Sequence, residues 1–398
     1  VSVQGAQYCL FAFLAASAAG TFIGGPNGNA YLQRVLKQSE KVDDFAERLT
    51  MMLLEIPRDD DEFAAMYACR KRILDSLPKN LSLISHYCQR TGKYQKDAVY
   101  YLTDSTEDEE HEFLRCLSSY DYSETELLQI TKFSFPQVYK YLVPFSFSQA
   151  NMPLPASDTT LRTEITKYFQ DYKQQKLTNQ IWPDFMKQVV RYAEERPYNK
   201  LPARSTLAAR MDRKGAQLFF FDALGVEYLS YILEKCEEYG LIAEILIGVC
   251  QLPSITCENK DFISFFGNNF KKIDDLDELK HHSQIFDYQQ CKEPIHLFRE
   301  LEIIDKQLQQ IRKGLIQDSF NKAVIISDHG ASRLAVISNH QSKSNIHLDE
   351  KGEHSGRCCP TSSDPGIPFA AYTPNGYVVL ANYDRFKGGR AANVEVHG

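Results

Sequence analysis

Two short apolar runs in the second half of the chain constrain its fold more than any other feature. Residues 218–221 and 323–326 are all apolar, and an aspartate follows each run within two positions. Uninterrupted apolar runs of this length are typical of strands covered on both faces, as in parallel sheets. One amphipathic helical pattern follows the first run, at residues 226–241, and another precedes the second run, at residues 297–320. Strands that alternate with helices predict an α/β fold, with a mostly parallel sheet flanked by helices.

We expect three strands of this sheet and one later hairpin. The first strand lies in 216–221 and the third in 322–327. The second strand is expected within residues 242–260, where the chain leaves it through a proline. The pattern YTPNGYVVLANYDRF at 372–386 predicts a late strand or hairpin.

The first half of the chain predicts helices. Apolar positions recur at spacings of three and four in residues 31–56, and Ser123 followed by Glu126 matches a capping box. A length of 398 residues favours two or more domains. Prolines and a basic cluster at 197–213 mark a linker, so we assign residues 1–205 to an all-helical domain and 206–398 to the α/β domain.

Charge and cysteine usage limit the class of protein. The net charge of −7 provides no broad basic surface, so nucleic-acid binding would need a local patch. The ten cysteines are scattered without a C-x-x-C pair, which favours reduced, mostly buried thiols in a cytoplasmic protein.

The apolar run at residues 9–23 predicts a packing helix. It is shorter than the ~20 residues of a spanning helix and has no basic residue before it. We therefore expect no membrane partner. The start at Val1 and the end after NVEVHG favour a fragment cut at both ends, with the α/β domain truncated at its C-terminus.

Polar residues follow the predicted strands where each strand ends. Asp222 ends the first, Ser254 and Thr256 follow the second, and Asp328 and His329 end the third. Because the carboxyl ends of parallel strands share one edge, these side chains can converge. Two carboxylates, an imidazole and a hydroxyl suit a zinc-like or manganese-like cation. Such a cation would make the Thr256 hydroxyl a nucleophile, with Ser254 as the rival.

A second group of candidate ligands lies between the second and third strands. Asp277 and His281 are four residues apart, one helical turn, so both could reach one ion, and His282 is a rival ligand. His397 is the last imidazole of the chain. Asp277, His281 and His397 could bind a second ion beside the first, and two such ions favour phosphoryl transfer.

Arg357, in EHSGRCCP, is a candidate for bidentate binding of a substrate phosphate. An ordinary exposed arginine fits the same position equally well.

The order of these motifs resembles the PglZ domain family of the alkaline phosphatase superfamily. The motifs are FDALG, LPSIT, D-x-x-x-H, SDHGASRLAV and a C-terminal HG, over about residues 214–398. The phrases SITCENK and SDHGASRLAV, with the helical first half, are most similar to the PglZ phosphatases of type-four BREX phage-defence systems.

The resemblance implies an alkaline-phosphatase-like core with two divalent metals, usually zinc, and a Ser or Thr nucleophile. It implies that one metal is held by Asp222, Thr256, Asp328 and His329, and the other by Asp277, His281 and His397. Family members are phosphatases or phosphodiesterases, and in BREX they work beside methylation and ATPase components. Protein partners of a BREX complex are therefore expected.

Together these features predict a metal-dependent phosphoryl hydrolase acting on a phosphoester substrate, with Thr256 as nucleophile. One alternative is a non-catalytic assembly module whose helical half docks partner proteins. A second alternative is a metal-dependent nuclease, which requires a basic groove, and the cluster near Arg204 is the obvious candidate patch.

Overall fold

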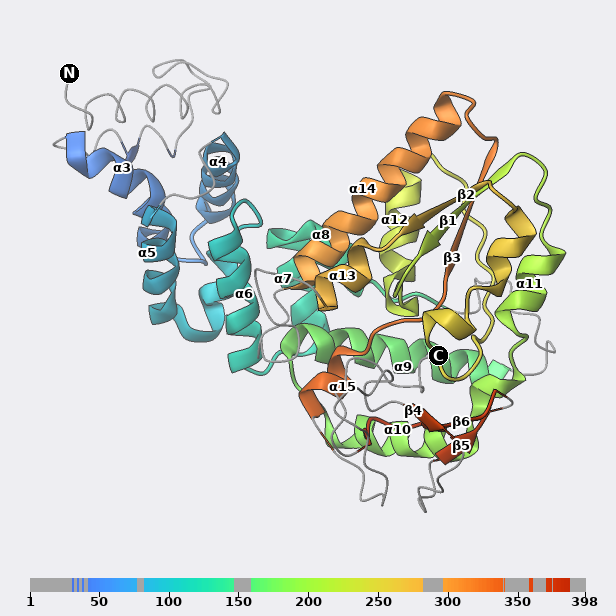
Figure 1. The fold of residues 1–398 in the computed structure, drawn as a ribbon. Coiled ribbons are helices and arrows are strands. Elements are labelled where there is room, and N and C mark those ends of the chain that lie inside the picture. The colour runs from blue at the N-terminus through green and yellow to red at the C-terminus, as the bar shows by residue number, and fades with distance from the viewer. Residues whose placement is uncertain are drawn as a thin grey trace. The chain divides into compact units, whose positions relative to one another are not determined.

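The chain forms two compact units, Val1–Pro136 and Gln137–Gly398 (Figure 1). The computed structural model describes residues 31, 34–35, 38, 42–76, 82–146, 159–281, 296–338, 340, 358–360, 370–373 and 375–386. Each unit is described by itself below.

The described part of the first unit consists of helices and 3₁₀ turns joined by loops, without a strand. Its helices are α3 (Val42–Met51), α4 (Phe63–Ser76), α5 (Ser82–Thr91), α6 (Glu107–Ser119) and α7 (Glu124–Ser134), with 3₁₀ turns η1 (Met52–Glu55) and η2 (Gly92–Tyr100). The capping box predicted at the start of α7 is confirmed, since the Ser123 hydroxyl accepts from the Glu126 N–H and the Glu126 carboxylate accepts from the Ser123 N–H.

The second unit contains the strands. Its helices are α8 (Pro136–Leu142), which starts at the division, α9 (Thr159–Thr178), α10 (Pro183–Glu195), α11 (Arg204–Arg210), α12 (Leu229–Glu238), α13 (Asp275–His281), α14 (His296–Ile316) and α15 (Arg333–Ser338). Its 3₁₀ turns are η3 (Pro197–Lys200), η4 (Val226–Tyr228), η5 (Thr256–Glu258) and η6 (Asp261–Phe266). The strands are β1 (Ala216–Phe221), β2 (Phe270–Ile273), β3 (Lys322–Ser327), β4 (Cys358–Pro360), β5 (Ala370–Tyr372) and β6 (Tyr377–Leu380).

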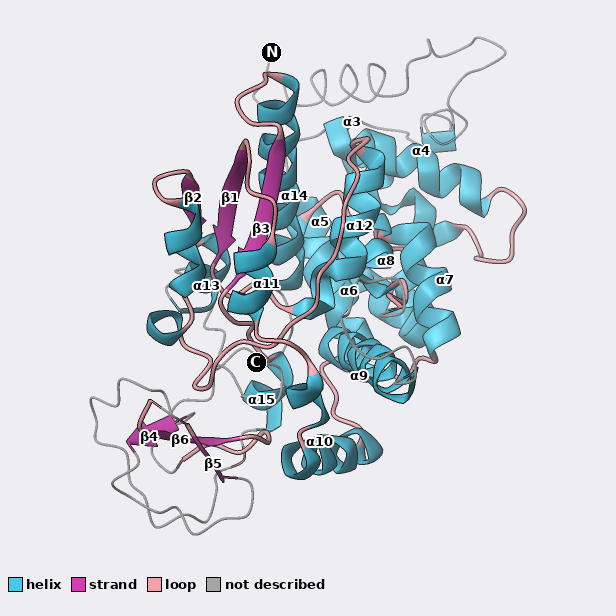
Figure 2. Cartoon of the chain, turned by 90° about the vertical axis from the view of Figure 1, so that its right-hand side faces the viewer, coloured by secondary structure: helices cyan, strands magenta, loops and turns pink. Residues whose placement is uncertain are grey.

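The main sheet has the order β2-β1-β3 and both pairings are parallel. Leu218 and Phe220 of β1 pack with α11 and η6, whereas Phe219 turns to the opposite face and meets Phe320 edge-on. Helices α12 and α14 lie on one side of the sheet and α11 on the other (Figures 1 and 2). The α/β fold with a parallel sheet flanked by helices is thus confirmed. The fuller alkaline-phosphatase-like sheet stays a prediction.

The predicted boundary near residue 205 lies inside the second unit. Tyr168 of α9 and Phe185 of α10 share a core cluster with Leu334 and Tyr383 from far along the chain. The hydroxyls of Tyr168 and Tyr383 are 3.1 Å apart. These helices belong with the sheet because their apolar faces are buried by residues that follow it.

The strand predicted within 242–260 is wrong. In this stretch Val249 forms only an isolated bridge with Ala203. The strand that accompanies β1 and β3 in the sheet is β2 instead. Ile245, Ile247 and Val249 pack in a cluster with helical residues, so this apolar run is used for packing rather than for a ladder. The late hairpin is confirmed, since β5 and β6 pair antiparallel.

Among the described residues, eight cysteines are free and six of these are buried, which agrees with the expectation of mostly buried thiols. None of the described helices has the length and apolar character needed to cross a membrane. The run at residues 9–23 lies outside the described residues.

Candidate metal centre

Asp222 and Asp328 are brought together by the pairing of β1 with β3. Phe221 lies opposite Ser327 in the parallel register, so the aspartate that follows each of these residues emerges at the same edge. Both carboxylates are buried, with Asp222 4% and Asp328 1% exposed. The predicted convergence of these two strand ends is confirmed.

Backbone groups hold the Asp328 carboxylate in place. Its Oδ1 accepts hydrogen bonds from the N–H of Ala223 at 3.2 Å and of His329 at 2.9 Å. Ala223 has a φ of 62°, a left-handed conformation that is uncommon for a residue with a side chain and costs about 1–3 kcal/mol. This strained residue turns its N–H to the carboxylate. The Ser327 hydroxyl accepts from the Leu224 N–H at 3.0 Å and joins the two loops further.

The His329 imidazole lies between the two carboxylates. Its Nε2 is 3.5 Å from Asp222 Oδ1 and 3.5 Å from Asp328 Oδ2. Its Nδ1 is 3.0 Å from the carbonyl oxygen of Gly330, which can only accept a hydrogen bond. Nδ1 therefore carries a proton, and in the neutral ring the Nε2 lone pair faces the acids, the arrangement found in metal-binding histidines.

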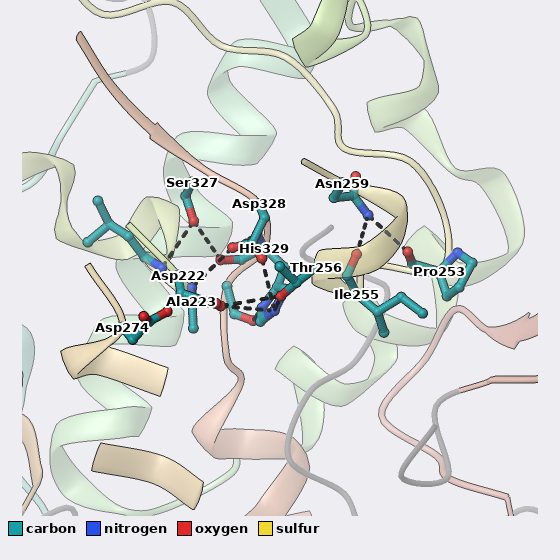
Figure 3. A network of polar contacts seen from close by, with 12 residues as sticks. Asp222, Ala223, Pro253, Ile255, Thr256, Asn259, Asp274, Ser327, Asp328 and His329 are labelled. Carbon is teal, nitrogen blue, oxygen red and sulfur yellow. Dashed lines mark hydrogen bonds and ion pairs between the residues drawn. The ribbon is translucent and has the colours of Figure 1, made fainter. Parts of the chain in front are cut away.

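Thr256 joins this group from a separate loop (Figure 3). Its hydroxyl is 3.5 Å from Asp222 Oδ1 and 3.4 Å from His329 Nε2. It lies in the turn η5 rather than at a strand end, so the reason given for its position was wrong although the position itself was predicted. The rival Ser254 is buried two residues earlier.

Asp277 reaches the same group from the first turn of α13. Ligand atoms of Asp222, Asp277 and His329 all lie within 4.8 Å of one another. The side chain of His281 is not described, and His282, Arg357 and His397 lie outside the described residues. The expected second ligand set of Asp277, His281 and His397 is therefore represented by Asp277 alone.

The acidic groups are held in an unfavourable environment for negative charge. Burial, followed by the charge of Asp328, raises the pKa of Asp222 to about 6. Burial also raises the pKa of Asp328, against the lowering effect of the Thr256 hydroxyl and of backbone N–H groups. Perturbed carboxylates of this kind cluster at sites that bind cations or perform proton transfer.

Sequence reasoning missed two lysines that contact this centre. Lys272 of β2 places its Nζ 3.0 Å from Asp222 Oδ2 and so leaves Oδ1 facing the other ligands. The buried Lys280 of α13 donates to the Ala223 carbonyl at 3.4 Å and lies 3.5 Å from Glu300. Lys280 falls inside the D-x-x-x-H motif, but nothing in that spacing distinguishes a buried lysine from a solvated one.

The residues present fit a divalent cation. Two carboxylates, an imidazole and a hydroxyl form a mixed oxygen and nitrogen donor set, as zinc and manganese accept. Asp328 Oδ2 is buried, and no described residue gives it a hydrogen bond of normal geometry. A buried carboxylate oxygen in that state costs free energy unless a cation balances it.

The described residues thus define a mixed α/β protein with an acidic, histidine-containing centre at the carboxyl edge of a parallel sheet. A family model described as a domain of unknown function (DUF7863) matches residues 20–120, which lie in the first unit and end before the centre begins. The chain matched no curated protein and no solved structure.

Proposed function

We propose that the chain is a metal-dependent phosphoryl hydrolase with Thr256 as nucleophile. The observation that carries the proposal is the Thr256 hydroxyl at 3.5 Å from Asp222 and 3.4 Å from His329, beside a second buried carboxylate. A hydroxyl next to candidate metal ligands is what covalent phosphoryl transfer requires.

Each residue has a defined task in this reaction. Asp222, Asp328 and His329 would hold the cation, which would act as a Lewis acid that lowers the pKa of the hydroxyl and offsets negative charge. Thr256 Oγ1 attacks phosphorus in line, the bond to the leaving oxygen breaks, and that oxygen takes up the proton that the Thr256 hydroxyl gives up. Water then attacks the phosphothreonine, which releases the phosphate group and restores the hydroxyl. Electrostatic stabilisation and alignment dominate in such transfers.

Four further points remain predictions of the sequence and its resemblance. They are a second metal at Asp277, His281 and His397, zinc as the resident ion, a phosphate contact by Arg357, and a place among BREX partner proteins in the cytoplasm. Phosphatase and phosphodiesterase activity use the same groups and differ in the shape of the pocket.

The test combines metal content with turnover of a chromogenic phosphomonoester and a chromogenic phosphodiester. We expect the wild-type chain to bind zinc or manganese and to hydrolyse at least one ester. Asp328→Ala combined with His329→Ala should lose both properties. Thr256→Ala should keep the metal and lose about a thousandfold or more in kcat, because the covalent step is gone.

A matched control uses another Asp and His pair of the same unit. His340 Nδ1 lies 2.6 Å from Asp384, and the double change to alanine should leave metal content and turnover unaltered. Thr256→Ala with wild-type kcat would refute the nucleophile. Absence of both metal and turnover in the wild type would favour the assembly module.

The nuclease alternative needs a basic groove, and one observation weighs against the expected patch. Arg204 was its leading residue, but its guanidinium donates to backbone carbonyls of Ser327, Asp328 and Asn259 within the protein. The Arg204 guanidinium is therefore already bonded within the protein and does not form part of a basic groove for a nucleic-acid backbone.

A further inference from the structure

The loop that carries Thr256 is folded around one buried side chain. Asn259 is fully buried, and its amide nitrogen donates to the carbonyls of Gln251 at 2.9 Å, Pro253 at 3.0 Å and Ile255 at 3.1 Å (Figure 3 shows two of these contacts). Its amide oxygen accepts from the Gln251 N–H at 2.8 Å. The loop is not part of a sheet, so its backbone groups lack hydrogen-bond partners on a neighbouring strand. The Asn259 side chain provides hydrogen bonds to them instead.

Arg204 ties that loop to the end of β3. Its Nη1 donates to the carbonyls of Ser327 at 2.9 Å and Asp328 at 2.7 Å. Its Nη2 donates to the carbonyl of Asn259 at 2.8 Å and to the amide oxygen of Asn259 at 3.1 Å. One planar group therefore spans the two segments that supply the nucleophile and the ligands.

The start of α11 anchors Arg204 itself. The N–H of Arg204 donates to the carbonyl of Val249 at 2.8 Å, and its guanidinium lies over the ring of Phe262 at 5.0 Å. Its partners here all belong to the protein: main-chain groups, Asn259, the Phe262 ring and the Asp261 carboxylate at 3.8 Å. Its position thus depends on the fold and is fixed before any substrate arrives.

We propose that Arg204 and Asn259 are positioning residues that set the distance between the Thr256 hydroxyl and His329. The inference rests on the proposed function. A lysine cannot replace the fork, because a single ammonium cannot keep four bonds in one plane to two segments. Misplacement of a nucleophile by about 1 Å costs on the order of a hundredfold in rate.

The kinetic test uses Arg204→Lys, Asn259→Ala and the double variant. We expect Arg204→Lys to lower kcat by about tenfold to a hundredfold, with KM within about threefold and metal content unchanged. The double variant should be little worse than Asn259→Ala, because both changes release the same loop. Arg213→Lys is the matched control, since Arg213 donates only to the Ala208 and Ala209 carbonyls at the end of α11 in the contacts described, and it should keep the wild-type kcat.

Amide hydrogen exchange provides a readout that does not depend on turnover. In Arg204→Lys, exchange should accelerate about tenfold or more in peptides covering 251–259, with β1 and β3 unaltered. Loop exchange equal to that of Arg213→Lys would overturn the proposal, as would faster exchange with wild-type kcat. If the wild-type chain hydrolyses neither ester, the proposed function fails, and loop exchange alone then decides whether the pair fixes Thr256. Should Asn259→Ala fail to fold, Arg204→Lys carries both measurements.

Discussion

Replacing Asp222 with asparagine should stabilise the metal-free protein at neutral pH. Burial and the nearby Asp328 charge raise the pKa of Asp222 from 3.8 to about 6. The folded state therefore holds this proton more tightly than the unfolded chain. The resulting stability is fully present below pH 3.8 and is lost as the pH rises through about 6.

The magnitude follows from the two pKa values. Each pKa unit corresponds to about 1.36 kcal/mol, so ionising Asp222 in the folded, metal-free protein costs about 3 kcal/mol. Asparagine keeps the shape without the charge but gives up the contact between Asp222 Oδ2 and Lys272 at 3.0 Å. The pKa of about 6 already includes the attraction of Lys272, so the net gain at about pH 7.5 should stay at about 3 kcal/mol.

Urea unfolding with a chelator present, at about pH 5 and about pH 7.5, measures this difference. We expect Asp222→Asn to exceed the wild type at both pH values, by about half as much at about pH 5 as at about pH 7.5, while it no longer binds metal. Asp274→Asn is the matched control, because Asp274 also pairs with Lys272 but its side chain is 43% exposed. An Asp222→Asn protein less stable than the wild type at the higher pH would refute the reasoning.

Three further predictions concern other parts of the fold. Lys176→Met should lower the free energy of unfolding by about 3–5 kcal/mol, because Lys176 and Glu300 are fully buried 2.8 Å apart and the carboxylate would lose its nearest cation. Ser123→Ala should cost about 1 kcal/mol in chemical unfolding of the first unit by removing the cap of α7. His296 is fully buried with its pKa well below 6.5, so only the unfolded chain gains its proton. Stability should therefore fall as the pH drops below about 6.5, and His296→Gln should flatten that fall in thermal unfolding.

The controls for these changes are exposed counterparts. Lys187→Met removes a pair with Asp184 in which both side chains are mostly exposed, and it should leave the free energy of unfolding close to that of the wild type. His340→Gln, at an imidazole whose side chain is 68% exposed, is the matched substitution for His296→Gln. Equal effects of buried and exposed changes would contradict the role assigned to burial.

Four residues of the centre could be predicted because their positions depend on short stretches of sequence. Asp222, Asp328 and His329 follow apolar strands directly, and parallel pairing brings the ends of those strands together. Thr256 was predicted from its motif, although the strand expected before it is absent from the described fold. The turn η5 places the Thr256 hydroxyl beside Asp222 and His329 instead.

The supporting residues could not be predicted because their roles depend on tertiary contacts. Arg204 looks like part of a basic linker, and only its bond to a carbonyl 124 residues away places it inside the protein. Asn259 sits in the polar phrase CENK, which resembles an ordinary surface turn. The boundary expected near residue 205 falls inside the second unit for a similar reason, since helical periodicity does not reveal which later residues cover an apolar face.

The shared core of α9 and Tyr383 has a consequence for how this unit is made. The two hydroxyls of the Tyr168 and Tyr383 pair are separated by 215 residues of chain. A ribosome adds about 5–20 residues per second, so α9 waits about 10–40 s before its partner is synthesised. Lys176 similarly waits for Glu300, which lies 124 residues later. Until residues 334–383 have been synthesised, the apolar faces of α9 and α10 therefore lack the later residues that cover them in the folded protein.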